Sequence, residues 1–440
     1  NFTYDGPLSI EKIRNGFERI GGEYVGRDSK NIDRLSCKLR VRLINTKFIP
    51  ALIRVPLEFP TGFMVEGGMN SDEKQLLLTF SSDSVVYGEN VLLRRPALIF
   101  KTKEGKLTSL VQGIRKFGKS QIAFALSASA KDSLVKSALR WDDSKQDKHY
   151  GEILADLKWE RDNRLSLFVH PTDFAINDTT WHVYSGRVLF NHPSIKIDDF
   201  YVGRENQWLK IGGGFSNSPK DSLLVELKDI DVNYILNLFD IKPVKFNGMA
   251  TGVATVRKAK SDSIDINGVL AIPNFHFNDA LLGDANIHIN WNSSNGRICF
   301  DNTIIEEKGI GYTAVNGFVS PPEKGLDLQI QSKNTNLAFL NKYLNGILED
   351  VEGRTTGGTR IHGAFKAIDF SGTQNPELKI TIPAIGVRFG LDEGVVSLSP
   401  GIFDFSHFRI SDKEGNFGEF SGEMTHDHLK NIRYDFLLSE

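Results

Sequence analysis

The chain has 440 residues, with 53 basic and 55 acidic side chains and a formal net charge of −2. This near balance argues against a nucleic-acid binder, which needs a basic surplus or a basic patch. With 40% hydrophobic and 25% charged residues, the composition fits neither a disordered chain nor a membrane-spanning one. The excess of 30 Phe over 4 Met favours strands over helices.

The chain opens at Asn1 without Met, a basic n-region or an apolar h-region, so we expect a processed chain or a fragment of a longer protein. No stretch reaches the roughly 20 apolar residues that a membrane helix needs. The two cysteines, Cys37 and Cys299, are too far apart for a CxxC motif or a four-Cys zinc site. Two buried thiols are favoured over a long-range disulfide.

Three stretches are predicted to be helical and most of the remainder to be strand. Apolar side chains recur at helical spacing in residues 10–20, 232–239 and 336–351. Elsewhere apolar and polar residues alternate with period two, which predicts half-buried strands. Turns between such strands are marked by Asn-Gly pairs at 247–248, 267–268, 295–296 and 316–317.

The sequence contains an internal repeat. The second and third predicted helices are followed by Gly248 and Gly353, which are separated by 353 − 248 = 105 positions. Strand endings at Gly213, Gly317 and Gly422 are separated by 317 − 213 = 104 and 422 − 317 = 105 positions. Matching features at one spacing predict a repeat array in which each repeat opens with a short helix and continues as strands.

The predicted fold class is therefore all-β, built from repeats, with a few short helices. The expected segments form one continuous array: a less regular β segment at 1–120 with a short helix near 10–20, and β repeats at 121–231, 232–333 and 334–440, the last two each opening with a helix. Alternation alone leaves two arrangements open. The apolar faces of two sheets pack together in a closed sandwich, or the apolar face of one curled sheet stays open.

Residues 113–120 match the phosphate-binding loop pattern G-x-x-x-x-G-K-[ST] letter for letter. Such a loop requires a helix directly after its Lys, because the amides at the start of that helix hold the phosphates. The residues after Lys119 alternate like a strand instead. A turn between two strands is therefore favoured over a nucleotide site.

The remaining candidate chemistry is weak. His426 and His428 could share one face of a strand, but no third metal ligand lies nearby, so a solvated turn is favoured. The neighbouring carboxylates at 198–199 and 306–307 would face opposite ways on a strand, which does not suit the paired acids of a glycosidase, and edge or turn charges are favoured. We predict no catalytic residue, no metal and no cofactor, and hence no enzyme.

Residues 412–436 resemble the repeat ending of the TamB translocation and assembly module family, in the form found in Bacteroides-type bacteria. Residues 275–284 with Trp291 also resemble that family, as do residues 179–181 after His170 and Pro171. The likeness covers residues 150–440 well and the first 150 residues more loosely. None of these motifs is catalytic.

The resemblance implies a fragment of a larger periplasmic protein. Such a protein is anchored in the inner membrane by an N-terminal helix and reaches a BamA- or TamA-like outer-membrane barrel through its C-terminus, and neither segment is in this sequence. TamB-like proteins and their AsmA-like relatives form an elongated β-sheet curled into a U-shaped trough, or β-taco, with a hydrophobic groove. They are thought to carry phospholipids between the two membranes and to support outer-membrane protein assembly.

We therefore predict a trough that binds phospholipid acyl chains, since shielding each CH₂ from water is worth about 0.8 kcal/mol. The predicted groove lining is Ile287, Ile289, Trp291, Leu326, Leu328, Ile330, Ile380, Ile382, Phe403, Phe405, Tyr434 and Phe436. The alternative is a scaffold whose exposed strand edges add strands to outer-membrane β-barrel proteins without lipid transport.

Overall fold

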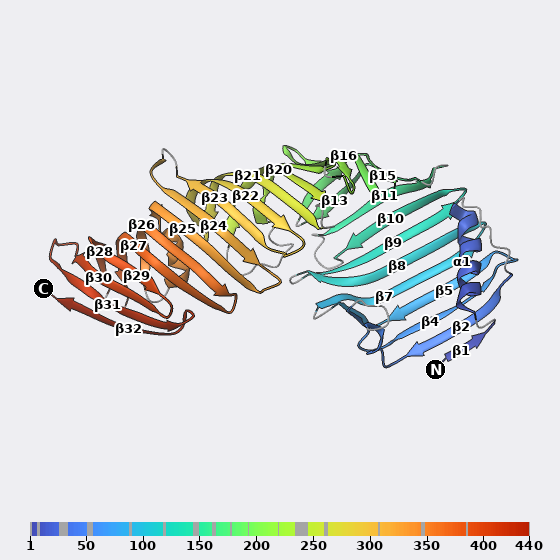
Figure 1. The fold of residues 1–440 in the computed structure, drawn as a ribbon, viewed down its shortest axis with the longest axis horizontal. Coiled ribbons are helices and arrows are strands. Elements are labelled where there is room, and N and C mark those ends of the chain that lie inside the picture. Colours follow the sequence, from blue (N-terminus) through green and yellow to red (C-terminus); the bar gives the residue numbers. More distant parts are fainter. Residues whose placement is uncertain are drawn as a thin grey trace. The chain divides into compact units, whose positions relative to one another are not determined.

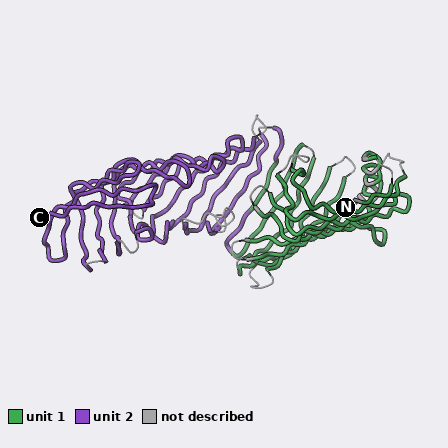
Figure 2. The backbone as a smooth tube through the Cα atoms, turned by 90° about the horizontal axis from the view of Figure 1, so that it is seen from below, with its two compact units in different colours: residues 1–205, 210–214 green, residues 206–209, 215–440 purple. Residues whose placement is uncertain are grey.

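The structure is a computed structural model of the chain. It describes all residues except 1, 7–8, 26–33, 51–55, 88–89, 118–119, 144–148, 161–163, 177, 192, 219, 234–244, 259–262, 307–308, 345–347, 384–385 and 440. The chain divides into two compact units: unit 1 is residues 1–205 with 210–214, and unit 2 is residues 206–209 with 215–440 (Figure 2). The predicted segment boundaries after residues 120, 231 and 333 do not coincide with this division and stay predictions.

Unit 1 holds the long helix α1 and a series of strands that lie side by side (Figure 1). Its elements are β1 (Phe2–Asp5), α1 (Ile10–Val25), β2 (Ser36–Leu43), β3 (Leu57–Glu58), β4 (Phe63–Asn70), β5 (Gln75–Ser82), β6 (Ser84–Tyr87), β7 (Asn90–Lys103), β8 (Lys106–Phe117), β9 (Ser120–Lys131), β10 (Leu134–Asp142), β11 (Tyr150–Trp159), β12 (Leu165–Val169), β13 (Thr172–Ile176), β14 (Thr179–Val183), β15 (Gly186–Asn191) and β16 (Ser194–Arg204). Strand β17 (Gln207–Phe215) contributes residues to both units.

In its described part, unit 2 holds the remaining strands and the short helical turns η2 and α4 (Figure 1). Its elements are β18 (Leu223–Asp231), β19 (Phe246–Asn247), β20 (Met249–Lys258), β21 (Ile264–Phe277), β22 (Ala280–Asn292), β23 (Ile298–Ile305), β24 (Tyr312–Ser320), β25 (Gly325–Asn336), η2 (Ala338–Leu340), α4 (Asn341–Leu344), β26 (Glu349–Ala364), β27 (Ala367–Ile382), β28 (Val387–Asp392), β29 (Val395–Ser399), β30 (Ile402–Ser411), β31 (Phe417–Asp427) and β32 (Lys430–Ser439).

The predicted all-β class is confirmed, and strand pairing is antiparallel in both units. The first predicted helix is confirmed as α1, which runs to Val25 and opens where the Ser9 side chain accepts the N–H of Lys12 at 3.3 Å. The second, at 232–239, lies mostly outside the described residues. The third is wrong at its end, because β26 begins at Glu349 and buries Val351 in a strand. Tertiary packing of Val351 overrides the helical spacing of the apolar residues there.

The predicted repeat has matching hydrogen bonds in unit 2. Strands β18 and β25 each carry a bulge, at Asp229 and Asn334, which both adopt a left-handed backbone with φ of 49° and 54°. The freed N–H of Asp229 donates to the Thr251 hydroxyl at 3.0 Å, and that of Asn334 donates to the Thr356 hydroxyl at 2.9 Å. The two bulge residues are 334 − 229 = 105 positions apart, and the two threonines are 356 − 251 = 105 positions apart. A bulge bends its strand, so the repeat encodes a bend at the same place in each copy.

A backbone hydrogen bond that follows each bulge also repeats. The N–H of Val232 donates to the carbonyl of Gly248 at 3.1 Å, and the N–H of Leu337 donates to the carbonyl of Gly353 at 2.9 Å. The two glycines have φ of 150° and 145°, a conformation that side chains rarely adopt. The same chain path therefore leaves the sheet after β18 and after β25.

Three glycines of the repeat, which the sequence places at strand ends, lie inside β17, β24 and β31 and share one backbone conformation. Gly213, Gly317 and Gly422 have φ of 105°, 130° and 145°. A Cβ added to Gly317 would lie 2.0 Å from the carbonyl oxygen of Asp327 on the neighbouring strand. Glycine at these positions lets adjacent strands fold toward each other, which is how a sheet acquires curvature. Figure 2 shows the backbone of each unit bending rather than running as a flat sheet.

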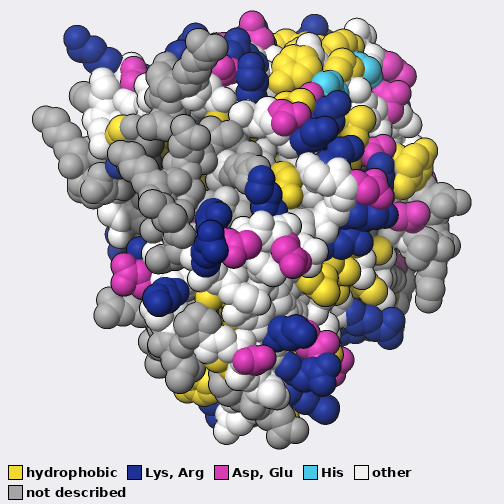
Figure 3. All heavy atoms as spheres, turned by 90° about the vertical axis from the view of Figure 1, so that its right-hand side faces the viewer, with side chains coloured by type: hydrophobic (Ala, Val, Ile, Leu, Met, Phe, Trp, Pro, Cys, Tyr) yellow, Lys and Arg dark blue, Asp and Glu magenta, His cyan; other side chains and the backbone are white. Residues whose placement is uncertain are grey.

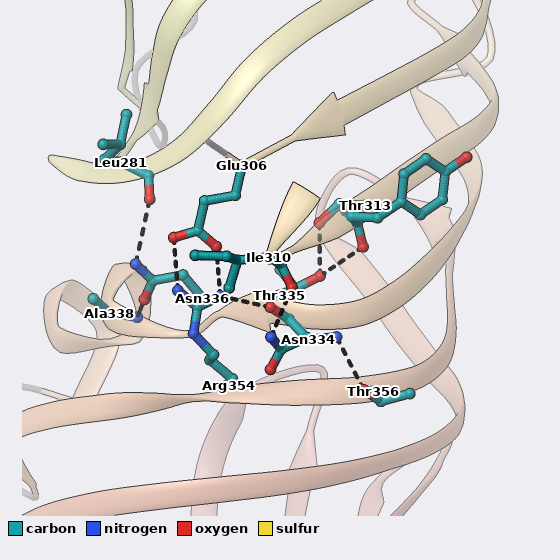
Figure 4. Close-up of polar contacts among 11 residues, drawn as sticks. Leu281, Glu306, Ile310, Thr313, Asn334, Thr335, Asn336, Ala338, Arg354 and Thr356 are labelled. Carbon is teal, nitrogen blue, oxygen red and sulfur yellow. Dashed lines mark hydrogen bonds and ion pairs between the residues drawn. The ribbon is translucent and has the colours of Figure 1, made fainter. Parts of the chain in front are cut away.

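A polar network holds the bend of β25 (Figure 4). Arg354 donates two hydrogen bonds to the carboxylate of Glu306, one of them 2.6 Å long, and a third to the carbonyl of Asn334 at 2.8 Å. The bonds to Glu306 raise the pKa of the Arg354 guanidinium above its usual value. Beside them the Thr313 and Thr335 hydroxyls are hydrogen-bonded at 2.7 Å. Glu306 thus lies directly after the end of β23, consistent with the expected edge or turn charge, and is held there in an ion pair.

Arg354→Ala is expected to lower the free energy of unfolding of unit 2 by about 2 kcal/mol, because it leaves a mostly buried Glu306 carboxylate without its partner. Arg360→Ala is the control. Arg360 pairs with Asp327 on the surface, so its loss is expected to destabilise unit 2 much less than the loss of Arg354. Urea unfolding of the two variants measures both values, and equal costs would show that the network does not hold the bend.

The two cysteines differ in exposure. Cys37 is buried in unit 1 as predicted, whereas Cys299 is exposed in unit 2, so the prediction of two buried thiols is wrong for Cys299. Burial raises the pKa of the Cys37 thiol. Cys299 faces outward because its neighbours on β23, Ile298 and Phe300, take the opposite face of the strand.

Iodoacetamide is expected to alkylate Cys299 at least tenfold faster than Cys37 at neutral pH, because a raised pKa lowers the thiolate fraction and burial blocks access. Mass spectrometry of timed, quenched samples measures both rates. In denaturant the two rates should converge. Equal rates in the folded protein would contradict the burial of Cys37.

Candidate functional site: an uncharged face of the sheet

The cross-strand register assembles the alternating apolar residues of unit 2 into rows on one face, here called the apolar face. Residues directly opposite each other on paired strands lie on the same face. The first row crosses seven strands, from β21 to β27, and consists of Ile266, Trp291, Ile298, Val319, Leu326, Gly363 and Ile368. Its six large side chains are half-buried.

Two further rows run parallel to the first. The second row consists of Gly268, Ile289, Phe300, Gly317, Leu328, Ile361 and Phe370. The third consists of Leu270, Ile287, Asn302, Val315, Ile330, Thr359, Gly372, Leu398, Phe403, Met424 and Tyr434. No position of the three rows carries Asp, Glu, Lys or Arg.

One margin of the apolar face is closed by helical segments. The next row includes the buried residues Ile272, Ala285 and Ile304, which form a core with Val232 and Ala250. A second core contains Val351, Ile380, Leu391 and Phe408, and Leu340 of η2, Leu344 of α4 and Leu348 pack against it. The apolar face therefore has a closed strip beneath helical turns and an open strip formed by the three rows.

Unit 1 has the same organisation. A row of Leu98, Val111, Leu126, Leu139 and Ile153 crosses β7 to β11 on one face. Helix α1 contributes Ile20 to a core with Leu35, Cys37, Met69 and Leu76, and Leu107 of β8 packs against this core. Leu126 is 43% exposed, so this face also stays partly open.

The exposed surface favours an open sheet over a closed sandwich. A sandwich would bury the three rows in its core, but their large side chains are half-buried or exposed. Among the described residues of unit 2, therefore, no second layer buries the three rows.

The opposite face is polar. In unit 2 it carries cross-strand ion pairs of Arg297 with Glu323, Arg360 with Asp327 and Arg388 with Glu352. The hydrogen bonds from Arg360 hold the pKa of Asp327 below its usual value. Figure 3, which looks onto the end of unit 1, shows acidic and basic side chains intermixed with scattered hydrophobic groups. The described strands thus form an amphipathic sheet.

The predicted lining residues fall into three environments. Ile287, Ile289, Trp291, Leu326, Leu328, Ile330 and Phe403 lie in the open rows. Ile380 is only 7% exposed and lies in the core beneath the helical turns, with Ile382 further along the same strand face and Phe405 packed against that core. Tyr434, at the end of the third row, and Phe436 lie on the last strand, β32, and are 66% and 43% exposed. The register unites most of the set on one face, but Ile380 is not accessible.

Sequence reasoning missed several members of the open rows. Ile266, Ile298, Val319 and Phe370 belong to the same face as the predicted residues. The sequence indicates the face of Ile266 and Ile298, because the same period-two alternation runs through residues 264–272 and 298–304. What the alternation cannot give is the register, which decides whether the faces of neighbouring strands coincide.

The other sequence candidates have structural explanations. Phe117 of β8 pairs with Ser120 of β9, so a strand follows the phosphate-loop motif where a nucleotide site needs a helix. Gly118 and Lys119 of the motif lie outside the described residues. Asp198 and Asp199 pair with Lys196 and Lys210. These two carboxylates are therefore held in surface ion pairs.

The predicted turn is confirmed at His428, although its Nδ1 is shielded from solvent, and the prediction of a solvated turn is wrong for His426. His428 lies in the turn between β31 and β32 and pairs with Asp369 at 3.0 Å. His426 is 7% exposed, because the alternation of β31 places it on the apolar face. Across the part of the chain that the structure describes, no three His, Cys, Asp or Glu side chains are grouped to hold a metal ion.

Comparisons with protein-family models, curated proteins and solved structures found no match to this chain. Among the described helices, none is long and apolar enough to cross a bilayer. The class that the fold and the site define is a repeat-built, single-layered amphipathic β-sheet with an uncharged open face.

Proposed function

We propose that this chain binds the acyl chains of phospholipids along the apolar face and forms the periplasmic part of a bridge between the inner and outer membranes. In that role it supports outer-membrane lipid homeostasis and outer-membrane protein assembly. The observation that supports acyl-chain binding is the set of three open rows without a charged side chain. The periplasmic location, the inner-membrane anchor and a BamA- or TamA-like barrel partner rest on the resemblance to the TamB family.

The open rows suit an acyl chain because they run across the strands. Seven strands at a spacing of about 4.8 Å give the first row a length of about 29 Å. Each CH₂ that leaves water for this surface contributes about 0.8 kcal/mol. Such binding needs no polar contact at a fixed position, so a lipid can shift along the rows without breaking a specific interaction.

The polar outer face suits an aqueous compartment. Its ion pairs keep the sheet soluble on one side while the other side carries lipid. A sheet with two apolar faces would aggregate or insert into a membrane. The amphipathic arrangement thus supports transfer of lipid through water rather than residence within a bilayer.

Lipid mass spectrometry of the purified chain tests this proposal. The chain is isolated without detergent from cells that express it, and its organic extract is compared with that of Leu328→Asp protein from the same cells. We expect phospholipid in the wild-type extract and at least tenfold less in the variant, because a carboxylate in the second row cannot be buried against an acyl chain. Lipid-free wild-type protein, or equal lipid in both, would contradict the proposal.

A further inference from the structure

The apolar face of β30 and β31 carries one ionisable side chain, His426. The positions that alternation and register assign to this face of the two strands are otherwise Phe403, Phe405, Phe408, Ile410, Gly418, Phe420, Gly422 and Met424. His426 is 7% exposed. His426 is therefore the one polar side chain on this face of β30 and β31, where every other position is apolar or glycine.

His426 borders the open rows. Its ring meets the ring of Phe403 edge-on, with centroids 4.6 Å apart, and Phe403 in turn meets Phe370 at 5.7 Å. Phe370 belongs to the second row and Phe403 to the third, and both are half-buried. The imidazole thus lies beside the surface that we propose to bind acyl chains.

The hydrogen bonds of His426 leave one donor unused. The backbone N–H of Leu429 donates to Nδ1 of His426 at 3.2 Å, so the ring proton of the neutral imidazole lies on Nε2. Among the described residues Nε2 has no hydrogen-bond partner, and it is shielded from solvent. A buried donor without an acceptor is unfavourable, and such groups in native proteins frequently serve a ligand.

We infer that Nε2–H of His426 binds the carbonyl oxygen at the head end of an acyl chain seated in the open rows, a step that rests on the proposed function. The acceptor chemistry is shared by the ester carbonyl of a lipid and the carboxylate of a free fatty acid. Because Nε2 is shielded from solvent and the Phe403 ring contacts the imidazole, we expect binding to displace the Phe403 side chain. The site gives the otherwise non-specific rows a fixed end point for the chain.

Binding of three probes to the full 440-residue chain tests this inference. The probes are oleate, methyl oleate and 1-octadecene, each measured by displacement of a fluorescent apolar dye. The variant is His426→Phe, which keeps an aromatic ring against Phe403 but removes the donor. The matched control is His288→Phe on the polar face of β22, where the side chain is exposed.

We expect His426→Phe to weaken binding of the carbonyl-bearing probes about two- to tenfold and to leave 1-octadecene binding unchanged. If the variant binds both oleate and methyl oleate more weakly, His426 recognises an ester or acid carbonyl. If it binds only oleate more weakly, His426 recognises a carboxylate. If binding of all three probes weakens equally, His426 acts only through packing. No weakening would mean that Nε2–H is satisfied by the Phe403 ring, and either result overturns the inference.

Nitrogen-15 NMR of the imidazole provides a readout that does not depend on the variant folding. Addition of oleate to wild-type protein is expected to shift the Nε2 resonance of His426, while 1-octadecene leaves it in place. If 1-octadecene binds and neither measurement distinguishes oleate from it, this inference fails and the proposed groove survives. If no probe displaces the dye, the proposed function fails as well.

Discussion

Gly317→Ala is expected to lower the free energy of unfolding of unit 2 by about 3 kcal/mol or more. The glycine has φ of 130°, and an added Cβ would lie 2.0 Å from the carbonyl oxygen of Asp327. A backbone oxygen cannot move aside as a flexible side chain can, so β24 and β25 must separate. Urea unfolding followed by circular dichroism measures the loss.

Gly105→Ala separates backbone strain from collision. Gly105 also has a left-handed φ, 68°, but nothing lies within 4 Å of its added Cβ. We expect a cost of about 1 kcal/mol there, because only the backbone conformation is penalised. If the two substitutions lower the free energy of unfolding equally, the close approach of β24 and β25 at Gly317 does not shape the sheet.

Leu328→Asp is expected to weaken binding of a fluorescent fatty acid by at least tenfold. Leu328 lies in the second row between Gly317 and Ile361. A carboxylate there keeps its water shell, and losing contact with two CH₂ groups of the ligand already costs about 1.6 kcal/mol. Titration of the purified variant by fluorescence gives the affinity.

Gln329→Asp is the matched control, because Gln329 is the next residue on β25 and faces the polar side. It adds the same charge one position away, and we expect unchanged binding. A similar loss in both variants would mean that net charge, not the apolar face, governs the affinity. Unchanged binding in Leu328→Asp would place the ligand elsewhere.

The local pattern of the strands was predictable because alternation is a property of the extended backbone. Ile287, Ile289 and Trp291 had to share one face of any strand that contains them, and so had Leu326 and Leu328. The repeat was predictable for a similar reason. Its glycines stand where the backbone conformation excludes other residues, so they recur at a fixed spacing.

Long-range packing was not predictable from the same pattern. Val351 fits a helix by its spacing from Leu344 and Leu348, yet it lies in β26, because it is buried beneath these residues. Ile380 alternates like a lining residue but lies in that same core. The position of the helical turns over one margin of the face decides both cases, and only the folded chain defines it.

His426 shows the same limit. As a residue near a predicted turn it was expected to be solvated, but β31 extends to Asp427 and keeps the side chain on the apolar face. The local sequence does not show that β31 continues to Asp427, because the end of a strand depends on pairing with the neighbouring strand. A histidine beside Phe403 is the kind of exception that marks a site for experiment.

Site-specific photo-crosslinking in living cells tests the central claim most directly. A photoreactive amino acid is placed at Leu328 on the apolar face and, in a second strain, at Gln329 on the polar face. We expect phospholipid adducts from position 328 and none above background from position 329. Adducts at position 328 only to outer-membrane barrel proteins, or equal lipid adducts at both positions, would contradict an acyl-chain groove.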